Sequence, residues 1–214
     1  MLERISRREE FDLFIAWIAI SLAFAIIFLR GSGRTDPVIA LLYLGISLLT
    51  VGIGFILHEM AHKFTALKYG FWAEFRKDNT MLVVAVALAA LVGVVFAAPG
   101  ATVIYDVNGR GISREQNGKI SVAGPMVNLL LCIPFTALLI FGGSIFITNN
   151  LLTMTGMIGL QVNAMIAAFN MLPISVLDGR KVLAWNAAVF VLMILAAFGM
   201  LLLSFYSDAL VNLL

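Results

Sequence analysis

The feature that most constrains this chain is a series of long apolar runs without a charged residue. The longest begins at Ser121 and ends at Leu177, and the others cover residues 13–29, 38–57, 81–98 and 182–207. A helix needs about 20 apolar residues to cross the roughly 30 Å hydrocarbon core of a bilayer. The 121–177 run is long enough for two crossings, and its polar stretch 148–150 predicts the turn between them. We therefore predict a polytopic, all-α membrane protein.

Composition excludes several other classes of protein. The chain is 62% hydrophobic and 12% charged, whereas globular domains are about 45–50% apolar and about 25% charged. A single cysteine excludes a disulfide framework and a multi-cysteine metal cluster. The net charge of +2, with no block of basic residues, argues against a nucleic-acid partner. We expect the lipid bilayer as the environment and no soluble cofactor.

The distribution of Lys and Arg favours one topology. Six full crossings divide the 14 basic residues evenly between the two faces, which violates the positive-inside rule. If residues 81–98 instead enter the membrane and return, all basic residues except Arg30 and Arg34 share one face. We expect five to six transmembrane helices, with 81–98 either re-entrant or spanning and the re-entrant form favoured. A re-entrant backbone must be satisfied by protein or by a wet cavity.

A short extended segment follows this run. Residues 101–105 are rich in β-branched side chains, and Asn108-Gly109 behind them is typical of a hairpin turn. We predict a small membrane-associated β-hairpin here, whose strand edge could hold an unwound peptide segment. The whole chain, 1–214, is expected to form a single transmembrane domain, with its core at 38–182 and peripheral helices at 11–29 and 183–207.

Both histidines of the chain lie in one motif, H-E-x-x-H, at the end of the second apolar run. Four residues of helix turn through about 400°, so His58 and His62 share a face and can bind one zinc ion. Glu59 follows the first ligand and is placed to take a proton from zinc-bound water. The alternative is a helix end with incidental polar residues. Glu59 argues against it, because a carboxylate close to an apolar span is costly.

A catalytic zinc site uses three protein ligands and one open position. No further histidine is present, so the third ligand should be a carboxylate. Asp178 stands out because it ends the long uncharged stretch, whereas most other acidic residues lie in charged loops. The alternative reading is a loop aspartate that caps the last helix through its Asp-Gly turn.

Three ordered motifs resemble those of the site-2 protease family. They are residues 58–62 (H-E-x-x-H), 121–128 (S-x-x-G-P-x-x-N) and 170–179 (N-x-x-P-x-x-x-L-D-G). The resemblance covers about residues 38–182. The PDZ or CBS domains that family members often carry are absent from this sequence, and the 81–98 run is longer than the minimal family loop.

The resemblance implies an intramembrane zinc metalloprotease with one Zn²⁺ per chain. Its substrate would be a transmembrane protein, cut within or next to a membrane-spanning segment in regulated intramembrane proteolysis. Asp178 would be the third ligand, and Asn170 and Asn128 would contact the substrate or the transition-state oxygen. The active site would lie toward the cytoplasmic side of the cell membrane.

Other functions fit the residues less well. An intramembrane aspartyl protease needs a G-x-G-D aspartate that this chain lacks, and a rhomboid serine protease needs a further histidine. A CAAX-type zinc protease needs a downstream glutamate ligand, but Glu74 and Glu115 lie in charged loops. A metal transporter would place ligands in several spans, commonly with repeats. An inactive scaffold would more often have lost a histidine or Glu59.

Overall fold

Five long helices dominate the protein. The computed structural model describes residues 5–95, 99–107, 109–143 and 151–206. In this part of the chain five helices are long and apolar enough to cross a membrane: α1 (Arg7–Ser32), α2 (Pro37–Lys68), α4 (Arg114–Gly143), α5 (Leu151–Asn170) and α7 (Ala187–Phe205). The prediction of an all-α, multi-pass membrane protein is confirmed. The turn predicted at 148–150 lies outside the described residues.

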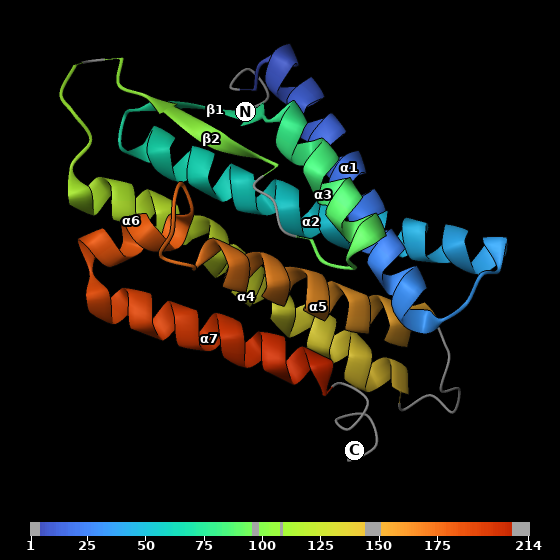
Figure 1. Ribbon diagram of the computed structural model, residues 1–214. Coiled ribbons are helices and arrows are strands. Elements are labelled where there is room, and N and C mark those ends of the chain that lie inside the picture. The colour runs from blue at the N-terminus through green and yellow to red at the C-terminus, as the bar shows by residue number, and fades with distance from the viewer. Residues whose placement is uncertain (1–4, 96–98, 108, 144–150, 207–214) are drawn as a thin grey trace.

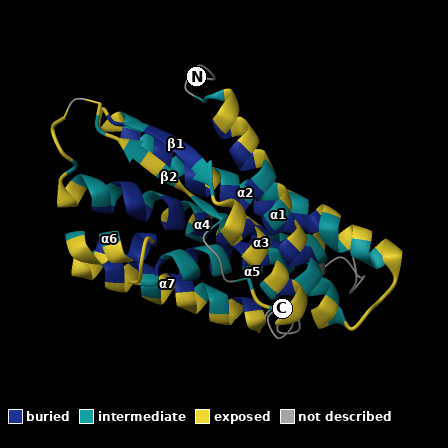
Figure 2. Cartoon of the chain, turned by 45° about the horizontal axis from the view of Figure 1, so that its top comes forward, coloured by how far each residue is buried: buried dark blue, intermediate teal, exposed yellow. Residues whose placement is uncertain are grey.

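The helices surround α2, α4 and α5, which pack on one another (Figure 1). Helix α1 and the short α3 (Asn79–Leu91) lie together on one flank, and α7 packs against α5 on the other. Buried side chains such as Phe24, Val51 and Val162 join α1, α2 and α5 into one core cluster. Figure 2 shows exposed residues along the outward face of α7, where Leu192 and Leu195 are about two-thirds exposed (70% and 67%). Such a surface suits lipid rather than water.

Helix α2 is longer than a membrane crossing requires. Its start is fixed by Asp36, whose side chain accepts a hydrogen bond from the Val38 amide at 2.7 Å, and by Pro37 in the first turn. Its 32 residues extend over about 48 Å at 1.5 Å per residue. Helical geometry therefore continues through residues 58–62 to Lys68, so the H-E-x-x-H motif is held on a rigid element.

The sheet has two antiparallel strands, β1 (Trp72–Lys77) and β2 (Gly100–Tyr105). The extended segment at 101–105 is thus present, but its partner lies upstream, and Asn108-Gly109 does not join the two strands. The predicted small antiparallel sheet is therefore confirmed, but its second strand was expected on the wrong side of 101–105, because Trp72–Lys77 shows no alternating pattern that predicts a strand. Residue Asn108 itself lies outside the described residues.

The segment between the strands leaves and returns at one point, since Lys77 pairs with Gly100. Helix α3 within it has 13 residues, or about 20 Å, which is too short to span. It packs along α1, and the Arg30 guanidinium donates to the carbonyl oxygens of Ala89 and Ala90 near its end. This geometry suits an excursion better than a sixth crossing. Residues 96–98 of the expected 81–98 run lie outside the described residues.

The last apolar run is broken into two helices. Helix α6 (Asp178–Trp185) ends before Asn186, and α7 begins after it, so the peripheral helix expected at 183–207 begins four residues later. Asn186 is extended, and its side chain accepts hydrogen bonds from the amides of Ala188 (3.0 Å) and Val189 (3.1 Å). Hydropathy does not reveal this break, because a capping asparagine is one polar residue in an apolar run.

Candidate metal centre

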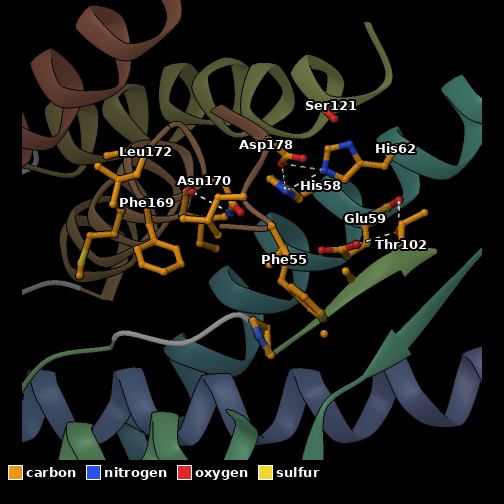
Figure 3. A pocket seen from close by; sticks show the side chains of 18 of the residues that line it. Phe55, His58, Glu59, His62, Thr102, Ser121, Phe169, Asn170, Leu172 and Asp178 are labelled. Carbon is orange, nitrogen blue, oxygen red and sulfur yellow. Dashed lines mark hydrogen bonds and ion pairs between the residues drawn. The ribbon is translucent and has the colours of Figure 1, made fainter. Parts of the chain in front are cut away.

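Two histidines and one aspartate converge on a single point. The i, i+4 spacing on α2 brings the Nε2 atoms of His58 and His62 to 3.0 Å from each other. Asp178, the first residue of α6, places Oδ2 at 3.4 Å from His58 Nε2 and 3.1 Å from His62 Nε2. All three side chains are buried, and Figure 3 shows them facing one another.

The donor set fits zinc. Zinc binds imidazole nitrogen and carboxylate oxygen at about 2.0–2.2 Å, so neighbouring ligand atoms in a tetrahedral site lie roughly 3.3–3.5 Å apart. The three observed separations are close to this range. Burial alone would raise the pKa of Asp178, but the charges and hydrogen bonds of His62 and His58 outweigh it and hold that pKa below its usual range. Asp178 would bind a metal as the carboxylate, whereas His58 and His62 would bind it as neutral imidazoles, without the positive charge that contributes to this lowering.

The far side of each imidazole ring is held by a hydrogen-bond acceptor. His62 Nδ1 lies 2.8 Å from the Ile120 carbonyl oxygen, which can only accept, so this nitrogen carries the proton. His58 Nδ1 lies 2.5 Å from Asn128 Oδ1. The Asn128 amide nitrogen donates to Gly54 O (3.1 Å) and Asn163 Oδ1 (2.9 Å), which fixes its oxygen toward His58. With Nδ1 held by an acceptor in each ring, Nε2 is the nitrogen of each ring that a metal would bind.

Gly124 on α4 explains how the helices approach so closely. A Cβ atom at this position would overlap the His62 ring and lie 2.7 Å from His58 Cε1. The glycine of the 121–128 motif thus lets the α4 backbone pack directly on the ligand rings. Any larger residue would have to displace a ligand.

Glu59 lies beside the ligands, and a hydrogen bond from the two-stranded sheet holds its carboxylate. Thr102 Oγ1 on β2 donates to Glu59 Oε2 at 2.8 Å. Figure 3 shows this contact next to His58 and His62. Sequence reasoning missed Thr102, because its only signal is its place in a β-branched stretch.

A cavity of about 320 Å³ opens beside this cluster. Its walls include the side chains of His58, His62 and Asp178 together with Glu59 and Thr102. Residues of the long helices also line it, among them Ile20 and Phe24 of α1 and Phe198 and Leu201 of α7. The metal cluster therefore faces a space lined largely by apolar parts of the membrane-spanning helices.

Comparison with known proteins finds a relative that matches almost the whole chain. A protein of Methanocaldococcus jannaschii named "Putative zinc metalloprotease" is 39% identical over 199 residues, which is 93% of this chain and 95% of the relative. The chain belongs to this zinc metalloprotease family. No protein-family model and no solved structure matches it.

Two further residues of this metalloprotease, Asn170 and Asn128, were expected to contact substrate. The structure places them in different surroundings. Asn170 lines the cavity, and its amide nitrogen donates to the Ile166 carbonyl oxygen at 3.0 Å. Asn128 is fully buried behind His58 and is not among the residues that line the cavity. Its position suits orientation of a ligand rather than contact with a substrate. Asn163, seven residues before Asn170, forms the interhelical hydrogen bond to Asn128.

Proposed function

We propose that this zinc metalloprotease is of the site-2 type and cuts a transmembrane protein within or next to a membrane-spanning segment, in regulated intramembrane proteolysis. The observation that carries the proposal is the cavity. Glu59, His58, His62 and Asp178 face a space walled in part by apolar residues of α1 and α7, which suits an apolar helical segment better than a water-soluble peptide. We treat residues 1–214 as one transmembrane protease domain.

The proposed ligands of one Zn²⁺ per chain are His58, His62 and Asp178. Zinc held there would supply Lewis acidity and lower the pKa of a bound water. Glu59 is assigned as general base. Thr102 occupies its Oε2 atom, which leaves Oε1 to accept the proton of the attacking water and to deliver it to the leaving amine.

The sheet offers a means of holding the substrate. A helical segment hides its carbonyl groups in hydrogen bonds and must unwind before water can reach them. Within the described residues β2 pairs only with β1, so its other edge is available for β-augmentation by the unwound segment. Asn170, which lines the same cavity, is assigned to contact with substrate or with the transition-state oxygen.

The basic face of the protein supports an orientation. The positive-inside rule places the amino terminus, the sheet and the start of α6 on the cytoplasmic side. We accordingly place the active site toward the cytoplasm and the protein in the cell membrane.

Metal content and cleavage test this function. Purified protein should contain about one zinc per chain, and Asp178→Ala should retain much less. Glu59→Gln should keep the zinc while cleavage of single-span membrane proteins in proteoliposomes falls roughly 10²–10⁴-fold. Glu115→Gln, an exposed change at the start of α4, is the matched control and should cleave normally. Full activity of Glu59→Gln would overturn the assignment of the base, and unchanged zinc in Asp178→Ala would reassign the third ligand.

A further inference from the structure

A buried ion pair lies one residue beyond the second histidine. Lys63 Nζ on α2 donates to Glu9 Oε2 on α1, and both side chains are completely buried, at 0% exposure. The Trp72 ring of β1 covers the ammonium group, with Nζ 5.3 Å from the ring centroid. Taking two charges out of water is expensive, and a buried pair is weak grounds for inferring stability. Its position therefore calls for another explanation.

The second oxygen of Glu9 extends the contact to the sheet. Glu9 Oε1 accepts a hydrogen bond from the Phe75 amide of β1 at 3.0 Å. Phe75 is the register partner of Thr102 on β2. Thr102 in turn donates to Glu59 Oε2. Glu59 and Lys63 are four residues apart on α2 and so lie on the same side of that helix.

These contacts form a closed ring that includes the proposed catalytic glutamate, Glu59. The ring runs from Glu59 along α2 to Lys63, across the ion pair to Glu9, through Phe75 to Thr102, and back to Glu59. We propose that Glu9 and Lys63 are positioning residues for Glu59, and that they act by fixing the two-stranded sheet that carries Thr102. The proposal rests on the proposed function only in taking Glu59 as the base.

The contact with Glu9 adds to the packing of the sheet on the helices. Two strands alone are marginally stable at best; here Phe75 of β1 packs on Phe55 of α2, and Glu9 binds the backbone amide of the same residue. A second contact between α1 and β1 is looser, because Asp12 lies 3.8 Å from Arg76 and 4.0 Å from Lys77. Among the ion pairs of the described residues, only the one that Glu9 forms links α1 to α2, and the same side chain also binds the backbone of β1.

Hydrogen exchange of the full-length protein in detergent tests the anchor without any substrate. The variant Glu9→Ala/Lys63→Met removes both charges together and so leaves no unpaired buried charge. Peptides covering 72–77 and 100–105 should exchange about tenfold faster or more, since a hydrogen bond to a charged group has been lost. The controls Glu10→Ala, an exposed neighbour on α1, and Asp12→Asn should leave these strands protected. Unchanged exchange in the double variant would overturn the proposal.

A companion variant separates the charge from the hydrogen-bond acceptor. Glu9→Gln/Lys63→Met retains a side-chain oxygen for the Phe75 amide, so it should restore most of the strand protection. Zinc content should stay at the wild-type level in both double variants, because neither residue touches the ligand atoms. If the double variants fail to fold, as judged by lost zinc and uniform exchange along the whole chain, the pair is merely structural and the proposal falls.

Kinetics then test the effect on Glu59. On a single-span protein that the wild type cleaves, Glu9→Ala/Lys63→Met should lower kcat about tenfold or more with KM little changed. Thr102→Val should do the same, Thr102→Ser should retain activity, and combining Thr102→Val with the double variant should add little. Additive losses, or faster strand exchange with unchanged kcat, would overturn the positioning role. If the wild type cleaves no membrane protein, the proposed function fails, and exchange still decides whether the anchor exists.

Discussion

At the scale of single residues, the hydrogen bonds behind the histidines determine what the ligands can do. Asn128 Oδ1 holds the Nδ1 proton of His58, and the remaining contacts of its amide tie it to Gly54 and Asn163. A residue that accepts a hydrogen bond from the far nitrogen of a ligand histidine orients the ring and raises the basicity of the ligand nitrogen. The metal affinity should therefore depend on a residue that does not touch the metal.

We predict that Asn128→Ala weakens zinc binding about 10–100-fold, measured by competition with a chelator of known affinity. Asn170→Ala is the matched control. The Asn170 side chain donates to the Ile166 carbonyl oxygen and not to a ligand histidine, so the zinc affinity of this variant should equal that of the wild type. If Asn128 instead serves substrate binding, its replacement will raise KM and leave zinc affinity intact.

At the scale of helices and strands, the break at Asn186 sets how α6 and α7 meet. Helix α6 carries Asp178 at its first residue, while α7 lines the cavity through Phe198 and Leu201. Asn186 accepts hydrogen bonds from the Ala188 and Val189 amides and so starts a new helix where α6 ends. This side chain thus contributes to both the ligand position and the cavity wall.

Replacing Asn186 with Ala should lower the free energy of unfolding by about 0.5–2 kcal/mol, the usual cost of losing a helix cap. Thermal unfolding in a fixed detergent measures the change. Asn186→Asp keeps an oxygen acceptor at the same place and should unfold close to the wild type. Equal stability of Asn186→Ala and the wild type would show that packing, rather than the cap, maintains the break.

At the scale of the whole molecule, five crossings would put the start of α1 and the end of α7 on opposite sides of the membrane. The short α3 and the pairing of Lys77 with Gly100 return the chain to the side it left. All basic residues but Arg30 and Arg34 then share a face. The number of crossings and the charge bias thus favour the same topology.

Cysteine labelling in sealed vesicles of known orientation tests this topology. The sole cysteine, Cys132, is buried, so labelling of introduced cysteines should have little background. Arg34→Cys should react with a membrane-impermeant maleimide only from outside, and Arg110→Cys only from the cytoplasmic side. Labelling of both positions from one side would contradict a five-span arrangement.

The sequence by itself determined the features that depend on local periodicity and composition. The apolar runs locate the spanning helices, because length and hydropathy are properties of each segment alone. The spacing of His58 and His62 likewise puts both rings on one face of any helix that contains them. Asp178 could be singled out as the acidic residue that ends the long uncharged stretch, although its approach to the histidines could not be derived from sequence.

The tertiary structure alone decided the features that depend on contacts between distant segments. The pairing of β1 with β2, the contact of Thr102 with Glu59 and the burial of Asn128 behind His58 join residues far apart in the chain. No periodic pattern encodes which partner a threonine or an asparagine will meet, since each forms similar hydrogen bonds in many settings. The tertiary structure also decided the break at Asn186, because one asparagine in an apolar run does not show that a helix ends and another begins there.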